Sequence, residues 1–312
     1  MVKINTTSLT LDNYVGNEQI KSIITDNIEV CKKKGSAFPH TLIYGQSGTG
    51  KTTLALAIAQ SMNVHIEEVN CGTPGLNPAI TLIKLPNRSI LFLDEIHSLS
   101  MSIIESMLYR FMEEGVIFLR YPDGRVEPFD VGRDITIMAA TTEPDKLPTP
   151  LINRFTLNLK LQPYTHEEMI EILKLNLGKT LDITSSAYTA LANATRYIPR
   201  HAVQYANIIR NYSIQYDLKT IDEVTMVKAL NGMGIDKYGL DTTDREYMTT
   251  IYKIYNNSPT GIKALALMLG ESESTITNRE LHLVREGYVI RTKQGRMLTG
   301  KGLRLAIEMS GL

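Results

Sequence analysis

Cysteine is scarce in this sequence, and neither sign of charge is in excess. Cys31 and Cys71 are the only two cysteines among 312 residues, and they form no CxxC pair. Two separated thiols cannot build a disulfide framework or a zinc site, so we expect reduced structural thiols in a cytoplasmic protein. Lys plus Arg and Asp plus Glu both total 33. The net charge of zero excludes a globally basic DNA-binding protein but leaves a local basic patch open.

Long hydrophobic runs are missing as well. No stretch approaches the roughly 18 consecutive apolar residues of a membrane-spanning helix. The N-terminal residues MVKINTTSLTLDN lack the apolar core of a signal peptide, so we expect no membrane partner. Internal repeats and low-complexity segments are also absent, and the apolar fraction of 43% is typical of folded globular protein. A chain of this length is expected to form two or three domains.

What the sequence does contain is three segments with different patterns. Up to residue 162, strand-like apolar runs alternate with helical patterns, which predicts an α/β domain around a parallel sheet. From 163 to 235 only helical patterns occur, with Thr165 as the expected cap of one helix and another helix starting near Pro199. In the first segment we predict strands at 41–44, 66–69, 90–93, 135–139 and 156–161, and helices at 52–61 and 101–113.

The third segment, 236–312, has the element order of a winged helix-turn-helix. We expect helices at 244–255, 262–269 and 272–286, and the last two end at Gly270 and Gly287. A β-hairpin follows, with strands at 288–292 and 296–299 on either side of a short turn. Three helices followed by a hairpin predict a winged helix.

The strongest motif is GQSGTGKT at residues 45–52, which matches GxxxxGK[ST]. It follows an apolar strand and opens a helix, which is the context that a phosphate-binding P-loop requires. Backbone N–H groups and the helix N-terminus favour negative charge there, Lys51 can reach the β- and γ-phosphates of ATP, and Thr52 can bind Mg²⁺. The predicted nucleotide-binding residues of this loop are Gly45, Gly48, Thr49, Gly50, Lys51, Thr52 and Thr53.

A second motif, ILFLDE, ends on Asp94 and Glu95. Asp94 follows an apolar strand, where it can hold Mg²⁺ through water, and Glu95 is placed to polarise the attacking water as a general base. Acid pairs after strands are often plain caps, but the P-loop about 40 residues upstream favours a catalytic pair. His97 has no partner at metal-binding spacing, so we expect a packed or solvent-facing histidine.

Further motifs resemble proteins of the AAA+ superfamily. The sequence ATT stands at 140–142, PLINRF at 150–155 and YIPR at 197–200. Their order and spacing resemble the RuvB-type Holliday junction branch migration ATPases. The similarity begins at LDNYVGN (11–17), continues through ALNGMGIDKYGLD (229–241) and ends near RTKQGR (291–296). It implies an AAA+ ATPase domain at 1–162, a helical lid at 163–235 and a DNA-binding winged helix at 236–312.

The resemblance also implies roles for single residues. Thr142 would be a sensor of the γ-phosphate or the attacking water, and Arg200 a second sensor that closes the lid on the nucleotide. Arg154 would be the arginine finger that reaches the ATP of the next subunit. Spacing alone does not exclude an ordinary surface salt bridge for either arginine. The residues that resemble those around adenine, with core packing as the alternative, are Tyr14, Val15 and Tyr164.

Four positions depart from the pattern of the family. Gln46 and Ser47 stand where the family usually has prolines, and Glu143 replaces an arginine after ATT. Ile152 replaces a second arginine near the proposed finger. These departures indicate a divergent member with an intact ATP site, and they leave open how subunit signalling and partner fit are altered.

Basic side chains are concentrated in the predicted winged helix. Between residues 261 and 304, eight cations against four anions leave a local charge of +4 in an otherwise neutral chain. Such a hairpin suits salt-sensitive, sequence-independent contacts with the phosphates of duplex DNA, although a solvated charged hairpin is the alternative. The predicted DNA-binding residues are Arg291, Lys293 and Arg296, and a ring of subunits would add their weak contacts together.

Residues 115–136 predict an inserted hairpin with Pro122, Asp123 and Gly124 as its turn. In RuvB-type proteins such a hairpin docks the junction-binding partner RuvA. Here an apolar surface is expected from Ile117, Phe118 and Leu119. A hairpin packed on its own domain is the alternative.

These features together predict an ATP-dependent DNA motor with ATP and Mg²⁺ as cofactors. By resemblance it forms a homo-oligomeric ring, a hexamer, and drives branch migration of four-way junctions in homologous recombination and DNA repair. Two other functions remain open. One is a loader or clamp-loader-like switch that hydrolyses ATP once per assembly event, and the other is a DNA-binding regulator whose ATP site sets only its oligomeric state. A catalytic base at Glu95 and a finger at Arg154 argue against the regulator.

Overall fold

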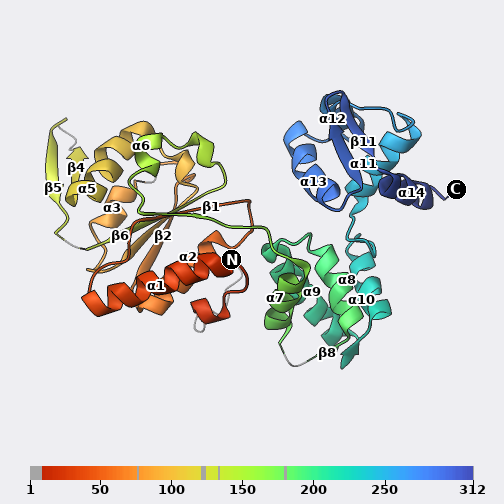
Figure 1. Cartoon of the computed structure of the whole chain (residues 1–312), viewed down its shortest axis with the longest axis horizontal. Helices are drawn as coiled ribbons and strands as arrows, with labels where there is room; N and C mark the ends of the chain where they lie inside the picture. The colour runs from red at the N-terminus through yellow and green to blue at the C-terminus, as the bar shows by residue number, and fades with distance from the viewer. Residues whose placement is uncertain (1–8, 76, 121–123, 133, 179–180, 312) are drawn as a thin grey trace. The chain divides into compact units, whose positions relative to one another are not determined.

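The structure is a computed structural model that describes residues 9–75, 77–120, 124–132, 134–178 and 181–311. The chain divides into two compact units, Met1–Glu168 and Met169–Leu312 (Figure 1). The P-loop domain, the helical region and the winged helix predicted from the sequence are all present. The exact boundaries at 162/163 and 235/236 stay predictions.

The first unit is built around a five-stranded parallel sheet with the order β2-β3-β6-β1-β7. Strand β6 lies between β1 and β3, so the carboxyl ends of these three strands meet at one edge of the sheet. All five predicted strands are confirmed, with ends shifted by at most two residues. Their bounds are β1 (Thr41–Tyr44), β2 (Ile66–Asn70), β3 (Ile90–Asp94), β6 (Thr136–Thr141) and β7 (Leu157–Lys160).

Both faces of this sheet are covered, which explains why its strands read as continuous apolar runs. Leu42 and Leu91 point into a core on one face, whereas their neighbours Ile43 and Phe92 point into a core on the other. Helices α1 (Glu18–Lys34) and α2 (Lys51–Met62) cover the second face (Figure 1). The first face is covered by α3 (Pro78–Leu82), α4 (Met101–Ile103), η4 (Ile104–Tyr109), α5 (Arg110–Glu114) and α6 (Thr149–Ile152). The described residues of the unit also form three 3-10 turns, η2 (Leu11–Asn13), η3 (Ile96–Ser98) and η5 (Pro144–Lys146).

The helical run predicted at 101–113 is confirmed, but its middle is a π-helical turn. The turn η4 lies between α4 and α5, and Gly115 ends the run in the left-handed conformation with φ of 72°. Such turns insert one extra residue and often occur at functional sites. Met107 and Leu108 from this turn are buried in the core.

The inserted hairpin is present as β4 (Val116–Arg120) paired antiparallel with β5 (Val126–Asp130). Two residues of its predicted turn, Pro122 and Asp123, lie outside the described residues. Gly124 adopts a positive φ of 86°, as a turn glycine can.

The apolar docking surface predicted on this hairpin is wrong for Ile117, whereas Phe118 and Leu119 are half-buried. Ile117 is completely buried in the core of its own domain, and Leu119 packs against that core. The ring of Phe118 lies under the guanidinium of Arg110 at 5.8 Å. Among the described residues of the hairpin, the exposed large apolar side chains are Val126 and Phe129 on β5.

In the described part of the chain, four helices follow β7, and the first of them crosses the boundary between the two units. Thr165 caps the first of them, because its hydroxyl accepts from the Glu168 backbone N–H at 3.2 Å and the Glu168 carboxylate accepts from the Thr165 N–H at 2.7 Å. The expectation of helices alone is wrong in one detail, since β8 (Asp182–Ile183) and β9 (Thr220–Ile221) form a short parallel pair. Two residues are too few to show a strand period in the sequence. The helices are α7 (His166–Leu177), α8 (Ser185–Ala194), α9 (Pro199–Gln215) and α10 (Glu223–Gly232).

The rest of the second unit is a winged helix, as predicted. Strand β10 (Val289–Thr292) pairs antiparallel with β11 (Gly295–Leu298) after helices α11 (Thr242–Lys253), α12 (Ile262–Leu269) and α13 (Glu273–Arg285). A final helix, α14 (Gly300–Met309), was not predicted. It packs so closely on the start of the hairpin that a Cβ on Gly302 would lie 2.0 Å from the carbonyl oxygen of Tyr288.

A cluster of four charged groups, three of them half-buried, joins the helical part to the winged helix within this unit. Arg196, before α9, binds Asp241 at 2.8 Å and also Asp244, and Arg279 on α13 binds Asp241 at 2.7 Å. Asp244 is completely buried. Removing one partner of such a cluster leaves an uncompensated charge, so the cluster fixes the start of α11 against both neighbours.

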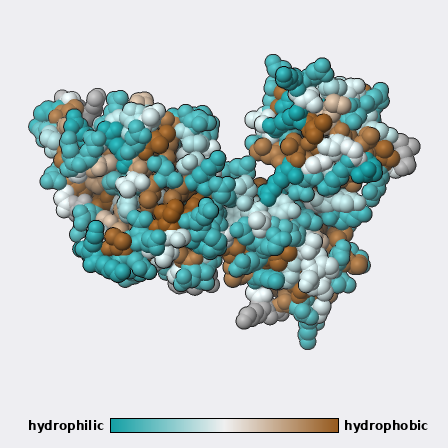
Figure 2. Space-filling model, in the orientation of Figure 1, coloured by the Kyte–Doolittle hydropathy of each residue, from teal (hydrophilic) through white to brown (hydrophobic). Residues whose placement is uncertain are grey.

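Hydrophilic side chains cover most of the visible surface of each unit (Figure 2). The exposed large apolar side chains are spread over different elements. Among the described residues, no helix combines the length and the apolarity that crossing a bilayer would require.

Candidate functional site

The P-loop connects β1 to α2 at the carboxyl edge of the sheet. Its three glycines have positive φ angles of 157° (Gly45), 77° (Gly48) and 94° (Gly50), which other residues rarely adopt. The loop therefore needs glycine at these positions to curve its backbone N–H groups around a phosphate. Helix α2 begins directly after it, at Lys51.

The side chain of Lys51 lies inside this loop. Its Nζ donates to the carbonyl oxygens of Gly45 at 3.0 Å and Gln46 at 2.9 Å, and the residue is 7% exposed. The Thr49 hydroxyl donates to the same Gln46 carbonyl at 2.8 Å. The predicted phosphate-binding cation is thus positioned within the loop, while the neighbouring Thr52 and Thr53 are half-buried on the first turn of α2.

Two tyrosines pack against the backbone of the P-loop. The Tyr164 hydroxyl donates to the Thr49 carbonyl at 3.1 Å and accepts from the Tyr14 hydroxyl at 3.1 Å. Both rings are buried, and burial is the main cause that raises the pKa of each phenol. A Cβ on Gly50 would lie 3.3–3.4 Å from the two hydroxyls. The predicted adenine contacts thus pack against the P-loop backbone in this structure, and Val15 beside them is half-buried.

The acid pair lies at the end of β3, close to the end of β6. Glu95 has a left-handed backbone with φ of 52°, which is uncommon for a residue with a side chain and often marks a functional position. Its carboxylate accepts from the Thr142 hydroxyl at 3.2 Å. Asp94 accepts from the Glu95 N–H at 3.1 Å. The structure therefore brings three predicted site residues together at the edge where the P-loop lies.

His97 joins this group, which the sequence did not predict. Its Nδ1 lies 2.9 Å from the Thr141 hydroxyl and 3.3 Å from the Glu95 carboxylate, and its Nε2 lies 3.1 Å from Glu143. Glu143 also binds Lys146 at 2.8 Å, and this contact is the first cause that lowers the pKa of its carboxyl. The histidine thus bridges the proposed base and one of the residues that depart from the family pattern. Among the described residues, no group of three His, Cys, Asp or Glu side chains is arranged to hold a metal ion.

The proposed arginine finger is held by its own subunit. The Arg154 guanidinium stacks over the Tyr109 ring at 4.2 Å, binds Glu113 at 2.8 Å and donates to the Pro150 carbonyl at 2.8 Å. Its Nε is buried and has no hydrogen-bond partner among the described residues. Tyr109 belongs to the π-helical turn and Glu113 to α5, so the helix after the acid pair positions this guanidinium.

Arg200 lies in the second unit, exposed on the first turn of α9. The predicted DNA-binding residues lie on the hairpin of the same unit. Lys293 is exposed in the turn, whereas Arg291 and Arg296 both bind Glu280 at 2.8 Å. In the sequence, Glu280 is one of the four negative charges between residues 261 and 304. Its spacing is the sequence signal that indicates burial, because Glu280 occupies the apolar stripe of α13 between Ile276 and Leu283.

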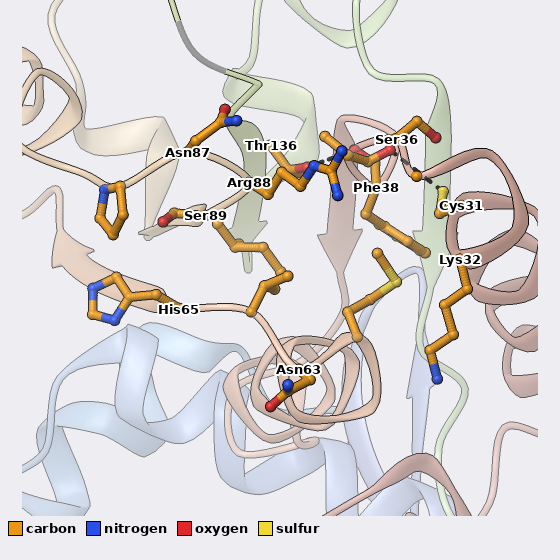
Figure 3. Close-up of a pocket in the computed structure, with 16 residues that line it drawn as sticks. Cys31, Lys32, Ser36, Phe38, Asn63, His65, Asn87, Arg88, Ser89 and Thr136 are labelled. Carbon is orange, nitrogen blue, oxygen red and sulfur yellow. Dashed lines mark hydrogen bonds between the residues drawn. The ribbon is translucent and has the colours of Figure 1, made fainter.

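A cavity of about 410 Å³ lies at the opposite, amino-terminal edge of the sheet (Figure 3). It is lined by segments that precede β1, β2 and β3, including Phe38, His65 and Ser89. The P-loop and the acid pair lie at the other ends of these strands. This cavity is therefore separate from the candidate nucleotide site.

Comparison with known proteins agrees with this arrangement. A family model described as the Holliday junction DNA helicase RuvB P-loop domain matches residues 7–161, and the RuvB C-terminal winged helix domain matches 237–306. The RuvB subunit of the Holliday junction branch migration complex of Phytoplasma mali is 35% identical over 93% of this chain and 89% of its own length. That of Orientia tsutsugamushi is 32% identical over 94% and 92%.

Solved structures agree as well. The RuvB Holliday junction branch migration motor of Thermotoga maritima has a TM-score of 0.79 and 31% identity, covering 96% of this chain and 97% of that one. Similarity on this scale spans the ATPase domain, the helical region and the winged helix. The chain therefore belongs to the RuvB family of P-loop ATPases.

Proposed function

We propose that this chain is the ATP-driven motor subunit of a ring that moves Holliday junctions along duplex DNA during recombination and repair. The observation that carries the proposal is the convergence of the P-loop, Glu95 and Thr142 at the carboxyl edge of one sheet, in a chain that also has a winged helix. The relatives named for branch migration support the same function. Both cysteines are buried free thiols, which supports the proposed cytoplasmic location.

Nucleotide binding would depend on the P-loop and its lysine. In the proposed complex the Lys51 ammonium exchanges the carbonyls of Gly45 and Gln46 for phosphate oxygens, while loop N–H groups bind the same phosphates. Thr52 and Asp94 would hold Mg²⁺, because a hydroxyl and a carboxylate are the oxygen ligands that this ion prefers. Bound Mg²⁺ would offset charge on the phosphates. Arg200 is proposed to close the lid over the nucleotide.

Hydrolysis would use Glu95 as the general base. Its carboxylate is held by the Thr142 hydroxyl and lies 3.3 Å from His97, so its orientation is fixed before water attacks. Arg154 of a neighbouring subunit is proposed to stabilise the transition-state charge, an effect on the order of 10³–10⁵ in rate in enzymes that use such a finger. Hydrolysis would therefore need a ring, which we propose to be a hexamer.

The hairpin and the winged helix would provide the contacts outside the ATPase site. We propose that a RuvA-like junction-binding protein docks on the 115–136 hairpin, through the exposed Val126 and Phe129 rather than the buried Ile117. The winged helix is proposed to contact DNA phosphates through Arg291, Lys293 and Arg296.

The test is ATP-dependent dissociation of a synthetic four-way junction at low salt. We expect the native chain to convert the junction into duplexes. We expect Glu95→Gln to bind ATP but to hydrolyse it at least about 100-fold more slowly and leave the junction intact, because a neutral amide cannot accept the proton. Glu105→Gln, which removes an exposed carboxylate from the same unit, is the matched control and should behave as the native chain.

The other candidate functions predict different results. ATP turnover with an intact junction, in the presence of a ring, would favour a loader-like switch. Sequence-specific DNA binding with negligible turnover would favour a regulator. The second result contradicts the motor proposal, and the first contradicts it when the RuvA-like partner proposed above is present in the assay.

A further inference from the structure

Glu280 is a completely buried carboxylate beneath the wing of the winged helix. Its Oε1 accepts from the Tyr247 hydroxyl at 2.9 Å and from Arg296 Nε at 2.8 Å, and its Oε2 accepts from Arg291 Nε at 2.8 Å. These partners come from α11, β10 and β11, while Glu280 itself is on α13. One side chain therefore connects four elements of the domain.

The two arginines need this carboxylate because of where the hairpin places them. Arg291 and Arg296 are directly paired across the antiparallel strands, so their side chains share one face of the hairpin. Like charges opposite each other repel. A carboxylate between them offsets that repulsion and still leaves one net positive charge from the three groups.

Glu280 binds each guanidinium through Nε, so this contact does not use the two terminal nitrogens of either arginine. Nε is the donor nearest the main chain, and the two terminal nitrogens point away from it. Arg291 also donates through one terminal nitrogen to the Thr277 carbonyl at 3.3 Å, and its side chain is 41% exposed. For Arg296, no hydrogen bond from a terminal nitrogen is found within the described parts of the domain.

We propose that Glu280 is a positioning residue that holds Arg291 and Arg296 in one orientation, so that their terminal N–H groups face the backbone phosphates of duplex DNA. The inference rests on the proposed function, because it deepens the DNA contact suggested there. Two guanidiniums held in a fixed orientation, at the spacing of directly paired strand residues, match phosphate oxygens better than two mobile cations do. Tyr247 donates the third hydrogen bond, and burial raises the pKa of its phenol, so it remains a donor.

This proposal and a simple count of charges predict opposite changes in DNA affinity for one substitution. Glu280→Gln removes a negative charge from a DNA-binding domain, so electrostatics alone predicts tighter binding to DNA. If Glu280 positions the wing, the same substitution releases both guanidiniums and weakens binding. Glu246→Gln makes the same charge change at an exposed site beside Tyr247 and is the matched control.

The experiment measures duplex binding by the full-length chain with a slowly hydrolysed ATP analogue, over a range of salt concentrations. We expect Glu280→Gln to lose roughly tenfold in affinity and to bind with a shallower salt dependence, because fewer phosphates are contacted. Glu246→Gln should bind as tightly as the native chain or more tightly. ATP hydrolysis without DNA should be the same in all three. Equal or tighter binding by Glu280→Gln would overturn the proposal.

Arg296→Lys covers the case in which Glu280→Gln destabilises the domain. Lysine keeps the charge, but its single ammonium cannot bind the carboxylate with one nitrogen and a phosphate with others. We expect it to lose most of the affinity that Arg296→Gln loses, and native-like binding by Arg296→Lys would refute positioning. If the native chain itself fails to bind duplex DNA, the proposed function fails instead, so the two failures are distinguishable.

Discussion

Acidification should destabilise the second unit through one histidine. His282 on α13 is 8% exposed, and neither of its ring nitrogens has a hydrogen-bond partner among the described residues. Burial lowers the pKa of this imidazole to about 3, and the nearby guanidiniums of Arg196 and Arg285 add to that effect. The folded protein therefore keeps His282 neutral at any pH near neutrality.

The direction of the stability change follows from comparison with the unfolded chain, in which histidine has a pKa of about 6.5. Between pH 6.5 and 3 the unfolded chain binds a proton that the folded chain does not. Titration of His282 therefore leaves the free energy of unfolding unchanged above pH 6.5 and lowers it as the pH falls toward 3. At pH 5 the loss is about 2 kcal/mol, from one and a half pKa units at about 1.4 kcal/mol each.

Calorimetric unfolding at pH 7 and pH 5 measures this loss, with His282→Leu as the comparison. Leucine is similar in size and cannot be protonated, so the variant should lose about 2 kcal/mol less than the native chain between the two pH values. For a unit of this size that is a difference of about 4–8 °C in the shift of Tm. Other titrating groups contribute equally to both proteins. Parallel pH dependences for the two would refute the argument.

Three further predictions concern other side chains of the two units. Asp244→Ala should destabilise the second unit by about 3 kcal/mol in thermal unfolding, because Arg196, Arg279 and the Asp241 N–H lose a buried acceptor, whereas the exposed Asp182→Ala should change stability by less than about 0.5 kcal/mol. Glu143→Gln should lower kcat several-fold with little change in KM for ATP, as measured by steady-state ATPase assays, because His97 loses the carboxylate that orients it beside Glu95. Burial and neighbouring carboxylates raise the pKa of the Cys71 thiol to about 12, so it should resist thiol reagents at pH 8 until the protein is unfolded in guanidinium.

The ATPase half could be predicted from sequence because its signals are local. The P-loop requires glycines at fixed positions, and the strands before it and before Asp94 are unbroken apolar runs. Each of these features occupies fewer than about ten residues and has few other physical explanations. Their convergence at one sheet edge then follows from parallel strand order.

What could not be predicted depends on contacts between distant residues. The burial of Ile117 depends on which face of a five-residue strand meets the core, and the apolar composition of that strand is ambiguous. The role of Glu280 depends on arginines 11 and 16 positions later in the chain. Counting charges treats such a group as a reduction of the basic patch, whereas the structure makes it part of that patch.

The stacking of Arg154 on Tyr109 has a consequence for the entropy of ring formation. A mobile arginine side chain carries about 2 kcal/mol of rotamer entropy, which is lost when it is fixed. Here the stacking contact, Glu113 and the Pro150 carbonyl have already fixed it within a single subunit. In the proposed ring, the nucleotide of a neighbouring subunit would therefore meet an ordered guanidinium. Its binding would require an exchange of the Glu113 carboxylate for phosphate, and little further ordering of the chain.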